Sequence, residues 1–165
     1  GVLDWVVNDY ETGPPDGRAV GILWDQRDVL YVAMVIGGGG SGIETHTAGG
    51  WQQFYGSGGF ANVTVLLRLD LQTGQPTAGT FSIARLSNGN TNTLFPTDLA
   101  LVNGQIVLYA DSFFSPLDVD LERMTQTTPG GSPFPYRVIL DASLQTAISA
   151  EAIGWDNVTE FSPLP

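Results

Sequence analysis

Short strand-like segments recur along this chain, several with alternating apolar and polar residues, and nowhere do apolar residues keep the three-and-four spacing of a helix. Glycine and proline, 21 and 10 of the 165 residues, separate the alternating segments. Alternation is the pattern of strands with one buried face, and frequent turn residues are typical of all-β domains. Apart from a short helix considered over residues 118–124, the sequence therefore predicts a single all-β domain over residues 1–165, with mostly antiparallel strands.

About nine strands are expected, including a hairpin around Asn103-Gly104, a dipeptide that strongly favours a tight turn. They span residues 2–7, 19–24, 29–36, 62–71, 80–86, 98–102, 105–111, 136–140 and 146–154. The apolar residues expected to face the core are Leu3, Trp5, Val7, Ile22, Trp24, Leu30, Val32, Leu67, Leu69, Ile83, Leu99, Leu101, Ile106, Leu108, Val138 and Leu140.

The strands fall into two similar units, over approximately 19–84 and 97–154, with residues 1–9 as a terminal strand. The matching segments are 22–33 with 99–110, at an offset of 77, then 66–70 with 137–141, at an offset of about 71, and the Leu-Gln-Thr turns 71–73 with 144–146. Because these features occur in the same order, we interpret the units as an internal repeat of hairpin, insertion, strand, turn and strand.

This order of features is carried by residues 25–33, 66–74, 97–110 and 138–146, which make up under half of the chain. It resembles bacterial β-propeller blades of the SBBP type. The resemblance implies that each unit is a blade-like sheet. Two blades cannot close a ring, since propellers contain about four to eight, so several copies would have to assemble one. The alternative is a β-sandwich built from the same strands.

The charge of the chain excludes several classes of partner. Seventeen acidic residues oppose six arginines, lysine and cysteine are absent, and the formal net charge is −11. Nucleic acids and anionic membranes need clustered basic residues, so neither is an expected partner. The missing lysine excludes Walker A loops and Schiff-base chemistry, and the missing cysteine excludes thiolate nucleophiles and iron–sulfur clusters.

Composition also suggests where the protein works. Low charge density, many small polar residues and an acidic balance fit an exported protein, so we expect it outside a bacterial cell or at its surface. The chain begins at Gly1 instead of Met, which is expected of a processed protein or a cloned fragment. The longest apolar run, residues 29–36, is too short to span a membrane as a helix.

A long insertion over residues 37–60 combines glycines with four candidate contact residues: Trp51, Gln53, Phe54 and Tyr55. Flat aromatic faces beside an amide are suited to stacking on a sugar or on another subunit. The alternative interpretation is that the aromatic rings fold down over the core and the glycines form turns.

Candidates for catalysis and metal binding are few. His46 is the only histidine, two residues after Glu44, and no Gly-x-Ser-x-Gly elbow is present, so no catalytic residues and no enzyme activity are predicted. Asp118, Asp120 and Glu122 alternate and are candidate calcium ligands, although the EF-hand pattern fails. A solvated acidic loop is the alternative, and no other cofactor is expected.

The leading hypothesis is an extracellular structural protein that assembles into a ring or filament. Strand edges and the glycine-aromatic insertion would make the contacts between copies. The terminal strand, with Leu3, Trp5 and Val7 on one face, would add to the sheet of a neighbouring copy. A carbohydrate-binding module or lectin is the first alternative, and a secreted hydrolase on a propeller-like scaffold is the second.

Overall fold

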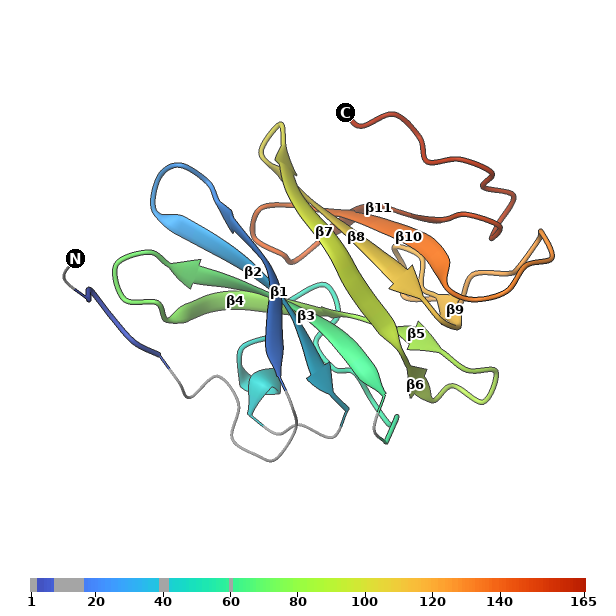
Figure 1. Ribbon diagram of the computed structural model, residues 1–165, viewed down its shortest axis with the longest axis horizontal. Helices are drawn as coiled ribbons and strands as arrows, with labels where there is room; N and C mark the ends of the chain where they lie inside the picture. Colours follow the sequence, from blue (N-terminus) through green and yellow to red (C-terminus); the bar gives the residue numbers. More distant parts are fainter. Residues whose placement is uncertain (1–2, 8–16, 39–41, 60) are drawn as a thin grey trace.

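The computed structural model describes residues 3–7, 17–38, 42–59 and 61–165 (Figure 1). In this part of the chain there are eleven strands and a single turn of 3-10 helix, η1 (Ile43–Thr45). The strands are β1 (Arg18–Trp24), β2 (Val29–Gly37), β3 (Asn62–Asp70), β4 (Pro76–Ser82), β5 (Ala84–Arg85), β6 (Thr91–Asn92), β7 (Leu94–Val102), β8 (Gln105–Ser112), β9 (Ser115–Pro116), β10 (Phe134–Leu140) and β11 (Ala147–Ala152). The all-β prediction is confirmed.

The strands form two four-stranded antiparallel sheets. The first sheet has the order β1-β2-β3-β4, and the second has the order β11-β10-β8-β7. Both sheets are meanders, because each strand pairs with the next long strand along the chain. A small sheet, β6-β5-β9, joins the loops at one end. No helix of the described residues has the length and apolar character needed to cross a membrane.

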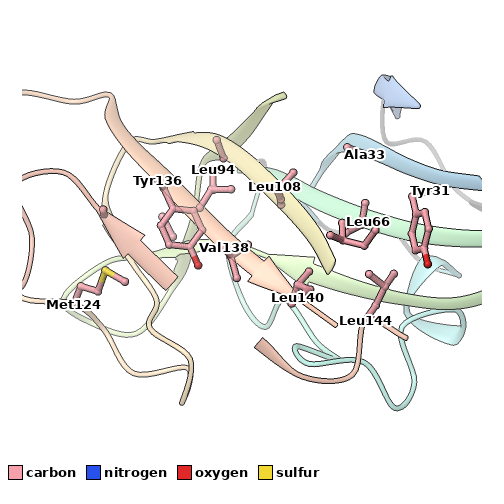
Figure 2. Close-up of a cluster of buried hydrophobic side chains, with 14 of the residues drawn as sticks. Tyr31, Ala33, Leu66, Leu94, Leu108, Met124, Tyr136, Val138, Leu140 and Leu144 are labelled. Atoms are coloured by element: carbon pink, nitrogen blue, oxygen red, sulfur yellow. The ribbon is translucent and has the colours of Figure 1, made fainter. Parts of the chain in front are cut away.

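The two sheets pack face to face around one core cluster. Val29, Tyr31 and Ala33 of β2 face this layer from one side. Ile106, Leu108 and Ala110 of β8 are the same positions moved by 77 residues, and they face it from the other side. Figure 2 shows side chains from both sheets in this layer, among them Leu66 and Leu108. The arrangement is compatible with a β-sandwich, and the described strands form no closed barrel or propeller.

Each sheet also has an outer face. Alternate residues of β2, β3 and β4 form a second core cluster there, covered by Ile43, Tyr55 and Leu117 from the loops. Residues 42–59 of the insertion are called the aromatic loop below. The outer face of the second sheet is covered by residues 159–165, called the strap below, which run above β10 and β11 in Figure 1.

Several predictions about the core and local structure are wrong. Leu3, Ile22 and Trp24 were expected inside, but their exposed fractions are 75%, 69% and 51%. Residues 3–7 form no strand, and residues 118–124 form a turn with one isolated bridge instead of a helix. Leu30, Leu99 and Leu101 are half-buried at the rim of the core.

Candidate assembly interface

An apolar row lies in solvent on strand β1. Ile22 and Trp24 alternate along the strand and therefore point to the same side, with exposed fractions of 69% and 51%. Val20, which is 40% exposed, precedes them at a register shift between Ala19 and Gly21. On the neighbouring strand, half-buried Leu30 and Met34 extend this row toward the covered outer face. We call Val20, Ile22 and Trp24 the apolar row.

The opposite side of β1 explains why this row faces outward. Gly21 packs against β7, where a Cβ atom would lie 3.6 Å from that of Leu99, and Leu23 contacts the core between the sheets. The inner side of β1 is thus used for packing. Its outer side lies beyond the aromatic loop, which covers residues of β2, β3 and β4.

The turn after β1 fixes the end of the row. The Asp25 Oδ1 atom accepts hydrogen bonds from the backbone N–H groups of Arg27, at 2.8 Å, and Val29, at 3.1 Å. The indole Nε1–H of Trp24 donates to the carbonyl oxygen of Arg27 at 3.2 Å. The Trp24 ring is therefore held against the turn while half of its surface stays exposed.

The four edge strands differ in how well they are protected. Charged residues and proline on an edge strand discourage pairing with another chain. Strand β7 contains Pro96 and Asp98, β11 contains Glu151, and β4 begins at Pro76 and is covered where the Phe81 N–H donates to Gln52. The interior of β1, by contrast, carries neither a charge nor a proline, because its single charged residue, Arg18, stands at its start. Its only irregularity is a register shift between Ala19 and Gly21.

The aromatic loop places its candidate residues in different surroundings. Trp51 is half-buried, and its Nε1–H donates to the Val119 carbonyl at 2.8 Å. Tyr55 turns toward the core and meets Phe81 edge-on, with ring centroids 5.6 Å apart. Phe54 is 63% exposed, and the Gln53 side chain beside it is also exposed.

Trp51, Gln53 and Phe54 line a shallow depression of about 360 Å³ together with the cationic side chain of Arg85. It is lined by Trp51, Gln52, Gln53, Phe54, Arg85 and Leu121. The Arg85 guanidinium donates to the Gly89 carbonyl at 2.9 Å, which holds it at this position. Within this one loop, Tyr55 therefore packs over the core while Phe54 is exposed to solvent.

Residues 3–7, expected to form an assembly strand, are not a strand and contact the turn after β3. Trp5 is half-buried, and its Nε1–H donates to the Leu71 carbonyl at 2.9 Å. A Cβ on Gly74, whose φ is +70°, would lie 2.4 Å from the Trp5 ring. Leu3 is exposed and Val7 is half-buried. Residues 3–7 therefore dock on the turn between β3 and β4 through one indole, and Val2, Asn8 and Asp9 lie outside the described residues.

The acidic residues proposed for calcium are not brought together. The Asp118 Oδ1 atom accepts backbone hydrogen bonds from Asp120 and Glu122, both at 2.9 Å, so this carboxylate caps its own turn. Within the described ranges no three His, Asp or Glu side chains are grouped so that they could hold a metal ion. Glu44 and His46, two residues apart in the sequence, lie within η1 and at its end.

Asp70 and Asp141 are ionised aspartates in corresponding turns of the two sheets. Hydrogen bonds from the Thr73 side chain and backbone lower the pKa of Asp70, in the turn after β3. Burial raises the pKa of Asp141, in the turn after β10, but hydrogen bonds from Ser143, Thr146 and Gln145 outweigh it and lower the pKa. Both aspartates therefore stabilise their turns as anions.

The sequence reasoning missed a buried ion pair under the strap. Arg137 of β10 is 3% exposed, and its guanidinium lies 2.5 Å from the Glu151 carboxylate of β11. Burial raises the pKa of Glu151, but hydrogen bonds from Ser162 and Arg137 outweigh it and lower the pKa. A signal was present, since Arg137 interrupts an otherwise apolar strand.

Comparison with known proteins adds no relative: no family model, curated protein or solved structure matches this chain.

Proposed function

We propose that this chain is a structural protein of the cell exterior that self-associates by pairing the β1 strands of two copies. The observation that carries the proposal is the apolar row on an edge strand whose interior has no charge or proline. Exposed, unprotected edges pair readily with other strands. The location outside the cell rests on composition, which is acidic and low in charged residues.

An antiparallel arrangement fits the charges at the ends of β1. Arg18 begins the strand and Asp25 follows its last residue. In an antiparallel pair about a two-fold axis near Gly21, Arg18 of one copy comes close to Asp25 of the second copy. A parallel pair would place like charges together, which disfavours it.

The pair would also cover apolar surface. The rows of the two copies would lie on the same face of one continuous sheet, with Ile22 of each copy near the axis. Full burial of a large apolar side chain contributes on the order of 1.5–3 kcal/mol, and Ile22 and Trp24 are more than half exposed. A contact of this kind is self-complementary and closes as a dimer, so a ring or filament needs a second contact.

A matched pair of lysine substitutions tests the proposal. Ile22→Lys places two charges near the proposed axis, whereas Ile148→Lys adds the same charge to an isoleucine that is 49% exposed on edge strand β11. Neither position is buried, so both variants should fold. We expect Ile22→Lys to lower the particle mass measured by light scattering and Ile148→Lys to leave it unchanged.

If Ile148→Lys lowers the particle mass and Ile22→Lys does not, β1 does not form the contact. Equal loss of association in both variants would point to a general effect of added charge instead. Circular dichroism and urea unfolding of both variants check that the fold is retained.

A second candidate function is saccharide binding at the aromatic loop, favoured by the exposure of Phe54 beside Gln53 and Arg85. Sugars bind to flat aromatic faces flanked by hydrogen-bonding groups. Phe54→Ala should abolish any binding found on a glycan array, while Phe113→Ala, at a ring that is 37% exposed elsewhere, should not. Equal binding by both variants and the unaltered chain would exclude this loop as the binding site.

A further inference from the structure

The strap, residues 159–165, crosses the outer face of the second sheet without joining it. It contains no strand, yet it runs from the end of the Trp155 turn to the turn between β7 and β8, where the Asn103 Nδ2–H donates to the Pro165 carbonyl at 2.5 Å (Figure 1). Its attachment is therefore made by side chains at a few points, not by a ladder of backbone hydrogen bonds.

Phe161 is the main anchor. The Arg137 guanidinium carbon lies 4.8 Å from the centre of the Phe161 ring, and the Tyr109 ring meets it edge-on at 6.2 Å. An arginine over an aromatic face is attracted to it, most strongly where water is excluded. Because Arg137 is 3% exposed, this contact is largely dry.

Ser162 completes the attachment. Its carbonyl oxygen accepts a hydrogen bond from Arg137 at 2.8 Å, and its Oγ–H and N–H donate to Glu151 at 2.5 and 3.2 Å. The strap thus contacts both members of the buried ion pair, although the Arg137 Nε–H stays without a hydrogen-bond partner. It also lies over a face that includes buried Val107 and Ile139, which are 0% and 4% exposed.

The chain before the strap is fixed to the body of the protein. The Val158 N–H donates to Trp155, the Gly154 N–H donates to Val158, and the Asn157 N–H donates to the Thr127 hydroxyl. Thr159 and Glu160 follow as exposed residues before the Phe161 anchor. Residues 159–165 therefore follow a fixed point of the chain and lie in a defined docking site.

We propose that the docking site on the second sheet receives the strap of a second copy, so that two chains exchange their arms in the assembled protein. All the contacts of Phe161 and Ser162 can be made between chains as well as within one, and exchange of an identical element is a low-cost route to association. Seven extended residues reach at most about 24 Å, so the two bodies must lie close together.

This inference rests on the proposed self-association and supplies the second contact that it needs. A dimer formed through β1 alone is closed. If the strap provides a different self-complementary contact, each chain has two, and dimers can then be joined into an open filament. Within one chain the strap competes at high effective concentration, so exchange is expected in concentrated, assembled protein.

The absence of cysteine makes cross-linking a direct test. Asn103→Cys and Pro165→Cys are prepared in separate chains, each with a different mass tag, and mixed under assembling conditions. A short bis-maleimide then joins residues 103 and 165 only if the strap of one chain lies on the other. We expect this mixed product in the assembled fraction and not in the monomer fraction.

Two controls define the outcomes. The double variant with both cysteines in one chain should cross-link internally in the monomer fraction, which shows that the positions are within reach. Phe161→Ala should remove the mixed product and reduce the particle mass to that of a dimer. Internal cross-linking in every fraction, with no mixed product, would overturn arm exchange.

The same experiment separates the two proposals. In an Ile22→Lys background, the two proposals together predict a dimer that still gives the mixed 103–165 product, whereas a particle mass equal to that of the unaltered chain would refute the β1 contact. Association that depends on Ile22 but yields no mixed product would keep the β1 contact and refute arm exchange.

Discussion

Removal of the Glu151 carboxylate tests the energetics of the face beneath the strap. The Arg137 side chain is 4% exposed and that of Glu151 is 17% exposed, with 2.5 Å between nitrogen and oxygen. Loss of one partner of a buried ion pair typically destabilises a protein by about 3–5 kcal/mol, because the other charge is left buried without compensation. Since water reaches part of Glu151, we expect Glu151→Ala to cost about 3 kcal/mol.

The complementary substitution should be milder. Arg137→Met replaces the guanidinium with an apolar chain that packs against Phe161, and the remaining carboxylate keeps the Ser162 hydrogen bonds and some access to water. We expect a cost of about 1 kcal/mol. The double variant Arg137→Met, Glu151→Ala leaves no stranded charge and should be more stable than Glu151→Ala alone.

Urea unfolding of the wild type, both single variants and the double variant measures these free energies in one series. The reasoning fails if Glu151→Ala is no more destabilising than Arg137→Met. It also fails if the double variant loses the sum of the two single costs, because the charges would then act independently.

Three further predictions concern the turns and the net charge. Gly74→Ala should destabilise the fold by about 1–2 kcal/mol because of the left-handed backbone at this position, and further because the new Cβ displaces the Trp5 ring. In a Trp5→Ala background, urea unfolding should show only the backbone contribution. The pKa values of Asp141 and Glu151 are lowered by folding, so their stabilising effect is complete above their ordinary pKa values of 3.8 and 4.5 and is lost as the pH falls below them. The free energy of unfolding should therefore decrease on acidification, and Asp141→Asn should reduce that slope; an unchanged slope would contradict the assignment. Because the chain carries a net charge of −11, added salt should increase the particle mass seen by light scattering, and a decrease would show that attraction between charges dominates the contact.

The strand content was predictable because the chain offers few competing patterns. The apolar run that became β2 and the Asn103-Gly104 turn between β7 and β8 each allow one local structure. The pairings of β1 with β2, β3 with β4, β7 with β8 and β10 with β11 also follow from the short turns that join these strands. The relation of the two units to propeller blades stays a prediction.

The burial of β1 was mispredicted because the two hairpins differ by one residue. Trp24 pairs with Leu30, so a faithful repeat at an offset of 77 would pair Leu101 with Val107. Leu101 pairs with Ile106 instead. A shift of one residue exchanges the two faces of a strand, so the side of β1 that carries Trp24 points outward while Leu101 borders the core. The sequence of β1 is apolar on both faces and could not decide between them.

The strap could not be predicted for a different reason. Residues 159–165 have no periodicity, and their attachment depends on Arg137 and Glu151, which belong to other parts of the chain. The different orientations of Tyr55 and Phe54 in the aromatic loop could not be predicted for the same reason. Only the position of Phe81 shows that Tyr55 turns inward while Phe54 does not.

The particle mass of the unaltered chain, measured by light scattering after size exclusion over a range of concentrations, tests the central claim most directly. Pairing through β1 predicts a mass that rises with concentration from 17.6 kDa to twice that value, and larger particles visible by electron microscopy if the straps exchange. A constant mass of 17.6 kDa at every concentration would contradict self-association.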